Sequence, residues 1–156
     1  MAGRSFTFVS GAGSPLSGHL EPPEGTPRGW AIFAHCFTCG KDSRAAVHIS
    51  RALSRAGIGV LRFDFAGTGI GGGTGEPVNF ASDVEDLRAA ANAMAAAGMS
   101  PSLLVGHSLG GTAAIVAAAD MPDIAAVATI GAPADLQHIL RLFGPNDLDT
   151  IASEGE

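Results

Sequence analysis

The chain has 156 residues, of which 46% are hydrophobic and 15% are charged. A chain of this length and composition can bury one core, so we expect a single folded domain. Nine Lys and Arg residues against fifteen Asp and Glu residues give a formal net charge of −6. That charge has the wrong sign for neutralising phosphates and disfavours nucleic-acid binding.

Apolar runs in the sequence are short, because Gly, Arg, Asp or Pro interrupts every one of them. None approaches the ~18 residues that a membrane helix needs, so we expect no membrane partner. The first fifteen residues lack the apolar stretch of a secretory signal. We therefore expect a cytoplasmic protein.

The first expected elements are a β-hairpin, with strands over residues 5–10 and 16–21. The apolar run at 30–35 is typical of a strand that is buried on both faces. Residues 43–56 place their apolar side chains on one stripe of a helix. Gly57 can terminate that helix.

The alternation of strand and helix then repeats along the chain. Helices are predicted over residues 82–97 and 109–119, and strands over residues 59–63, 102–106 and 124–131. Ser82 and Glu85 form a capping box for the first of these helices, and Gly98 is its predicted stop. Successive strand–helix–strand units predict an α/β fold, a mostly parallel sheet with helices on both faces.

After residue 133 the pattern weakens, with a short helix expected at 136–143 and an acidic tail at 144–156. We therefore assign the domain to residues 1–143. No strand is predicted beyond 124–131, so that strand would form an exposed, apolar sheet edge. Exposed edges tend to pair with other chains, and we expect a homodimer that forms through this one.

The segment GHSLG at residues 106–110 matches the pattern GxSxG between a predicted strand and a predicted helix. This context is typical of a nucleophile elbow, in which the turn forces Ser108 into strained backbone angles. The amides of the following helix, which begins at Leu109, would hold an oxyanion. The alternative is an ordinary glycine-rich turn in which Ser108 caps the helix.

His35, Cys36 and Phe37 close the strand at 30–35, where a hydrolase of this architecture places its other oxyanion amide. The backbone N–H of Phe37, or that of Cys36, would pair with the N–H of Leu109. Phe37 could instead be a core aromatic residue. We expect His35 to order its own loop through hydrogen bonds.

Cys36 and Cys39 form a single CxxC, which without a second Cys or His pair is half a zinc site at best. We therefore expect no metal site and interpret the pair as two reduced thiols. Because they flank the expected oxyanion amide, a disulfide or alkylation there would disturb the oxyanion hole.

The glycine-rich segment at residues 67–72 satisfies GxGxxG, but a dinucleotide site needs the helix to start inside the motif. The next helix is predicted only from about residue 82, so we interpret the segment as a flexible loop near the active-site rim. We expect Asp64 to anchor that loop through backbone hydrogen bonds. No cofactor is expected, and a nucleotide-binding module is the least favoured interpretation.

Four segments, HCFTCGKD, LRFDFAGTG, GHSLGG and ATIGAPAD, occur in an order and spacing that resemble the α/β-hydrolase family. More narrowly, they resemble bacterial serine hydrolases of the esterase or aminopeptidase type, which are often fused to an OsmC-like domain. The resemblance implies an eight-stranded sheet and a Ser–Asp/Glu–His triad in that chain order. The predicted fold is therefore α/β-hydrolase-like but truncated after its sixth strand, before the loops that carry the family's acid and histidine.

Few side chains could replace that missing acid and histidine. His19 in the hairpin, His48 inside a helix and His107 beside the nucleophile are poor candidates for the base. His138 follows the last predicted strand, and Asp135 stands three residues before it. They could act together within one chain or across a dimer, unless Asp135 only caps a helix and His138 lies on its surface.

These observations predict a serine hydrolase that acts on small carboxylic esters through an acyl-enzyme on Ser108. Serine proteases that lack triad members retain ~10³–10⁴-fold catalysis over water, so slow turnover is physically reasonable. The alternative is a non-catalytic or incomplete hydrolase fragment with a binding or assembly role.

Overall fold

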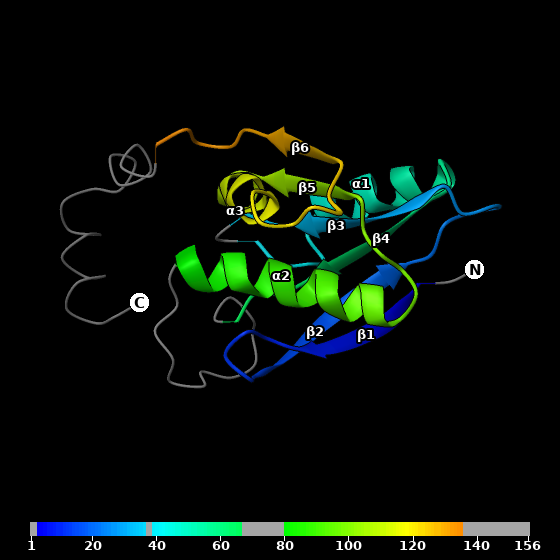
Figure 1. Cartoon of the computed structure of the whole chain (residues 1–156). Coiled ribbons are helices and arrows are strands. Elements are labelled where there is room, and N and C mark those ends of the chain that lie inside the picture. Colours follow the sequence, from blue (N-terminus) through cyan, green and yellow to red (C-terminus); the bar gives the residue numbers. More distant parts are fainter. Residues whose placement is uncertain (1–2, 37–38, 67–79, 136–156) are drawn as a thin grey trace.

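The computed structural model describes residues 3–36, 39–66 and 80–135, and in them the predicted strands and helices follow one another as expected (Figure 1). The strands are β1 (Arg4–Val9), β2 (Pro15–Glu21), β3 (Gly29–Ala34), β4 (Ile58–Phe63), β5 (Leu103–His107) and β6 (Ala126–Ile130). The helices are α1 (Arg44–Arg55), α2 (Phe80–Ala96) and α3 (Leu109–Ala118). The glycine-rich segment, the expected helix at 136–143 and the tail lie outside the described residues.

All six strands belong to one sheet with the order β1-β2-β4-β3-β5-β6. β2 pairs in antiparallel fashion with β1 and with β4, and the other neighbours are parallel. The predicted hairpin and the predicted mostly parallel sheet are both confirmed. Because β3 and β5 are parallel neighbours, their carboxyl ends meet at the same edge of the sheet.

The two faces of the sheet carry separate hydrophobic cores, because successive side chains of a strand point to opposite faces. On one face, Phe33 and Val60 pack with Ala46 of α1. On the other face, Ile32 and Leu61 belong to a larger core that includes side chains from α2 and α3. Figure 1 shows α1 behind the sheet and both α2 and α3 in front of it. The expected placement of helices on both faces is therefore confirmed.

Local signals account for several helix ends. The Ser43 hydroxyl accepts a hydrogen bond from the backbone N–H of Ala46 at 3.4 Å and caps α1. Gly57 and Gly98, which follow α1 and α2, have φ angles of 83° and 76°, a conformation that glycine adopts without a steric penalty. None of the helices in the described ranges has the length and apolar character to span a bilayer.

The predicted capping box at Ser82 and Glu85 is wrong. Helix α2 begins at Phe80, so Ser82 lies within its first turn rather than ahead of it. The Glu85 carboxylate forms an ion pair with Arg88, one turn further along the helix.

Strand β6 occupies one end of the sheet, as predicted. Four of its five residues are exposed, and Ile130 keeps 45% of its surface accessible. Within the part of the chain that the structure describes, β6 pairs only with β5. Among the described residues, one edge of this apolar strand is therefore unpaired, as an edge available for pairing would be.

Candidate active site

Ser108 sits at the sharp turn between β5 and α3 in a strained conformation. Its backbone angles are φ 54° and ψ −126°, and it is the only described residue other than glycine with a positive φ. Such a conformation costs about 1–3 kcal/mol and persists only where the surrounding structure enforces it. The Ser108 side chain makes no capping hydrogen bond to α3. Ser108 therefore occupies the N-cap position of α3 without using its hydroxyl as a cap.

Close backbone packing around two glycines enforces this turn. A β-carbon on Gly106 would lie 2.4 Å from the α-carbon of Gly111, and one on Gly110 would lie 2.3 Å from the carbonyl oxygen of His35. Real β-carbons do not approach other atoms this closely, so only glycine fits at either position. The backbone N–H of Ser108 also donates to the carbonyl of Ile130 at 2.8 Å. The turn is thus held against both β3 and β6.

The amino end of α3 lies directly beside Ser108. Leu109 is the first residue of the helix, and the first amides of a helix have no hydrogen-bond partner within it. The helix dipole adds a partial positive charge at this end. The packing of Gly110 against the carbonyls of Ala34 and His35 brings the end of β3 to the same place. Phe37, the expected second oxyanion donor, lies outside the described residues.

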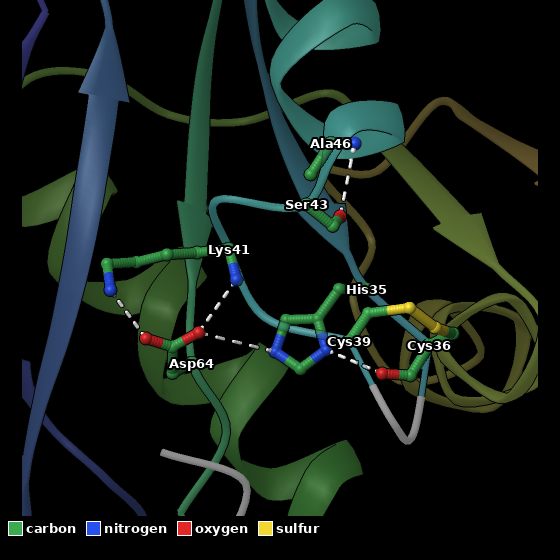
Figure 2. The surroundings of a disulfide bond; sticks show 7 residues. All are labelled: His35, Cys36, Cys39, Lys41, Ser43, Ala46 and Asp64. Carbon is green, nitrogen blue, oxygen red and sulfur yellow. Dashed lines mark hydrogen bonds and ion pairs between the residues drawn. A yellow bond between two sulfur atoms is a disulfide. The ribbon is translucent and has the colours of Figure 1, made fainter. Parts of the chain in front are cut away.

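His35 is buried and organises its own loop, as expected. Its Nδ1 lies 2.8 Å from the carbonyl oxygen of Cys36, and because a carbonyl can only accept, Nδ1 carries the proton. Its Nε2 lies 3.8 Å from Oδ1 of Asp64 (Figure 2). Burial lowers the pKa of His35, although the bond to Cys36 and the charge of Asp64 oppose this effect. His35 is therefore a neutral positioning group.

Two carboxylates anchor the backbone near the carboxyl ends of the strands. Asp64 accepts hydrogen bonds from the backbone N–H of Lys41 at 2.7 Å and from its Nζ at 2.6 Å (Figure 2). The Asp64 bond raises the pKa of Lys41. Asp86 of α2 accepts from the backbone N–H of Ala66 at 2.9 Å, just before the glycine-rich segment. Asp64 thus holds the connection from β3 to α1, and its predicted contact with 67–72 falls outside the described residues.

Cys36 and Cys39 form a disulfide (Figure 2), so the expectation of two reduced thiols is wrong. The backbone N–H of Cys39 donates to the carbonyl of Cys36 at 3.0 Å. This turn brings the two α-carbons to 5.1 Å, within the range that a disulfide can bridge. A ring nitrogen of His107 lies within 4.8 Å of both sulfur atoms. No local sequence pattern predicts that His107 lies beside the two cysteines.

Of the residues considered for the base and acid, the structure places His19, His48 and Asp135 but not His138. His19 lies on β2, 3.5 Å from the Glu21 carboxylate, and two strands separate β2 from β5. His48 is exposed on α1, on the face of the sheet opposite α3. Neither reaches the strand that carries Ser108. Asp135 is exposed a few residues beyond β6, whereas His138 lies outside the described residues.

Comparison with known proteins agrees with this geometry. Residues 25–147 match the family described as serine aminopeptidase, S33. The esterase domain of a Rhodothermus marinus protein is 45% identical, with a TM-score of 0.73 over 90% of this chain and 54% of that domain. No curated protein sequence matches the chain.

Two further structures share the fold. XC6422 of Xanthomonas campestris, described as an α/β serine hydrolase without a lid, is 25% identical with a TM-score of 0.75, over 87% of this chain and 64% of that one. The α/β hydrolase GrgF of a Penicillium species is 23% identical with a TM-score of 0.77, over all of this chain and 56% of that one. The chain thus spans between 54% and 64% of these three structures.

Proposed function

Because the chain belongs to the serine aminopeptidase S33 family of α/β hydrolases, we propose that it is a serine hydrolase that cleaves small carboxylic esters through an acyl-enzyme on Ser108. The observation that carries the proposal is the strained conformation of Ser108, whose side chain is not used as a helix cap. The 45% identity to a domain described as an esterase favours esters over peptides. Peptides also have poorer leaving groups, which need stronger acid assistance.

In the first step, the Ser108 hydroxyl oxygen attacks the carbonyl carbon of the ester while a base takes the hydroxyl proton. The π electrons of the carbonyl group move onto its oxygen, which becomes the oxyanion of a tetrahedral intermediate. When the tetrahedral intermediate collapses, the bond to the alkoxy group breaks, and the alcohol leaves with the proton. In the second step, water attacks the acyl-enzyme, releases the carboxylic acid and restores the Ser108 hydroxyl.

Oxyanion stabilisation comes from the amino end of α3. The Leu109 N–H lies at the positive end of the helix, and the N–H of Phe37 or of Cys36 is the second proposed donor. The neutral ring of His35 supports this second donor, because its Nδ1–H fixes the carbonyl of Cys36. One such donor is typically worth about 10²–10³-fold in kcat.

The proposed base is His138, oriented by Asp135. They act in the same chain or in a second copy paired along the open edge of β6, which lies beside β5 and its terminal Ser108 turn. Mixing a Ser108→Ala variant with a His138→Ala variant distinguishes these cases. If His138 acts across a homodimer, random reassortment restores up to about a quarter of the wild-type activity. If it acts within one chain, the mixture stays inactive.

Hydrolysis of p-nitrophenyl acetate by the purified chain tests the proposal. We expect turnover by the wild type and a loss of at least ~10³-fold in Ser108→Ala. Ser102→Ala is the matched control, because Ser102 is an exposed serine that precedes the other end of β5, and it should keep full activity. Equal rates for wild type and Ser108→Ala would contradict the proposal and favour a hydrolase fold with a binding or assembly role.

A second pair of variants tests the base. His138→Ala should lower kcat by about 10²–10⁴-fold, because general base catalysis contributes about that much. His48→Ala should leave the rate unchanged, since His48 is exposed on the opposite face of the sheet. If both variants behave like wild type, His138 is not the base.

A further inference from the structure

Three potential metal ligands converge at one edge of the sheet. The sulfur atoms of Cys36 and Cys39 and a ring nitrogen of His107 all lie within 4.8 Å of one another. Cys36 is buried, whereas Cys39 and His107 are half-buried. The cluster is therefore shielded in part from water and still accessible to a small ion.

The pairing of β3 with β5 brings the two chain segments that carry these ligands together. In the parallel register of β3 and β5, Ala34 stands opposite Gly106. Cys36 follows Ala34 by two residues, and His107 follows Gly106 directly, so both leave the sheet at the same point. Of the three ligands, His107 is the last residue of β5, whereas Cys36 and Cys39 follow the end of β3 by two and five residues. The strand pairing therefore holds the imidazole in place, and the short separation of the two cysteines keeps their sulfur atoms beside it.

We propose that the reduced chain binds one Zn²⁺ ion through the two Cys thiolates and the His107 imidazole. Two sulfurs and one imidazole nitrogen are a donor set that suits Zn²⁺. With Zn–S bonds of about 2.3 Å and a Zn–N bond of about 2.0 Å, tetrahedral donors stand about 3.5–3.8 Å apart. The sulfur–nitrogen separations, which are at most 4.8 Å, must therefore shorten by no more than about 1.3 Å, and the two sulfur atoms must move apart from bonding distance to about 3.8 Å. Three protein ligands leave the fourth position for water.

The disulfide prevents zinc binding, because the thiolate and not the disulfide sulfur is a good zinc ligand. A small dithiol opens it by giving up two electrons and two protons. The S–S bond breaks, two Cys thiols form, and the dithiol becomes a cyclic disulfide. Zn²⁺ then displaces the two thiol protons into solvent as the Zn–S bonds form. The oxidised chain has no thiolate to offer.

Metal titration of the purified chain tests this inference without reference to hydrolysis. The chain is reduced with a dithiol, freed of it under anaerobic conditions and titrated with Co²⁺ as a spectroscopic substitute for Zn²⁺. We expect thiolate-to-cobalt charge-transfer absorption that saturates at one ion per chain and disappears when Zn²⁺ is added. The oxidised chain should show no such absorption. An absence of the band in the reduced chain, or equal binding by the oxidised chain, would overturn the proposal.

Variants then assign the ligands. Cys36→Ser and Cys39→Ser should each abolish the charge-transfer band or weaken binding at least 100-fold. His107→Ala should weaken binding at least tenfold, and His48→Ala is the control with unchanged affinity. Wild-type affinity in His107→Ala would overturn the three-ligand site.

The variant His107→Cys distinguishes the loss of a ligand in His107→Ala from a failure of that variant to fold. It supplies a third thiolate at the same point, so tight binding should return with a stronger charge-transfer band. Circular dichroism of each reduced variant shows whether it is folded. If His107→Cys is folded and binds no better than His107→Ala, residue 107 does not face the metal and the proposal fails.

Discussion

Gly110 and His35 are in such close contact that a β-carbon on Gly110 would lie 2.3 Å from the carbonyl oxygen of His35. This contact fastens the first turn of α3 to the carboxyl end of β3. Ser108, the amino end of α3 and the carboxyl end of β3 are thereby held together. Both the proposed oxyanion hole and the proposed zinc site depend on this arrangement.

Gly110→Ala should therefore destabilise the protein. The added methyl group would meet backbone atoms, which cannot rotate away as a side chain does, and overpacking of this kind costs about 1–3 kcal/mol. Urea unfolding measures the change. Gly29→Ala is the control, because its β-carbon would lie 3.6 Å from the Ser102 hydroxyl, an ordinary contact, and the free energy of unfolding should change by less than about 1 kcal/mol. Equal stability of the two variants would contradict the close contact.

Asp64→Ala should loosen the connection between β3 and α1. The substitution leaves the backbone N–H of Lys41 without the acceptor that now lies 2.7 Å away, and hydrogen bonds to charged groups contribute about 1.5–3 kcal/mol. Asp42→Ala is the control. The Asp42 side chain is 67% exposed and forms only longer ion pairs, with Lys41 at 3.5 Å and with the buried Arg62 at 3.7 Å, so its loss should cost less than the loss of Asp64. A larger loss in Asp42→Ala than in Asp64→Ala would reverse the roles assigned to these carboxylates.

Most of the fold was predictable because it follows from short-range patterns. The apolar runs at β3, β4 and β5 and the stripe on α1 each reflect burial of that segment alone. The spacing of Gly106, Ser108 and Gly110 likewise predicted the strained turn, since the glycines are needed where backbones touch. Each of these features depends on residues that are close together in the sequence, so the local pattern is enough to predict it.

The remaining features depend on contacts between distant parts of the chain. The approach of His107 to the two cysteines follows from the pairing of β3 with β5, which no local pattern encodes. The bond from Asp64 to Lys41 spans 23 positions in the sequence. The disulfide was missed for a different reason, because CxxC is equally compatible with thiols, a metal and a disulfide.

The stability of the protein should fall as the pH rises through the range in which Asp83 titrates. Burial, assisted by the charge of Asp86, raises the pKa of Asp83 from 3.8 to about 7. The folded state therefore holds the proton more tightly than the unfolded state, and between pH 4 and 7 each pH unit costs about 1.4 kcal/mol. Below pH 4 both states are protonated, and above pH 7 the loss is complete.

Asp83→Asn isolates this contribution, because asparagine does not ionise. Relative to wild type, the variant should be more stable at pH 8 by up to about 4 kcal/mol and no more stable at pH 4. Urea unfolding at the two pH values measures the difference. A stability difference that does not depend on pH would show that Asp83 titrates normally.

Reduction of the disulfide should destabilise the chain modestly. Cys36 and Cys39 close a loop of only four residues, for which the chain-entropy relation gives roughly 2 kcal/mol. Thermal unfolding with and without a dithiol, in the absence of metal, measures the effect. The chain has only these two cysteines, so the double variant Cys36→Ser, Cys39→Ser should not respond to the dithiol. The same unfolding temperature for oxidised and reduced wild type would contradict the prediction.

The most direct test of the central claim is covalent labelling of Ser108 by a fluorophosphonate, read by intact mass and peptide mapping. The hydroxyl oxygen attacks phosphorus, fluoride leaves, and the adduct mimics the tetrahedral intermediate of ester hydrolysis. We predict one adduct per chain, located on Ser108, present in Ser102→Ala and absent in Ser108→Ala. An unlabelled wild type, or an adduct on another residue that persists in Ser108→Ala, would contradict the claim that Ser108 is the nucleophile.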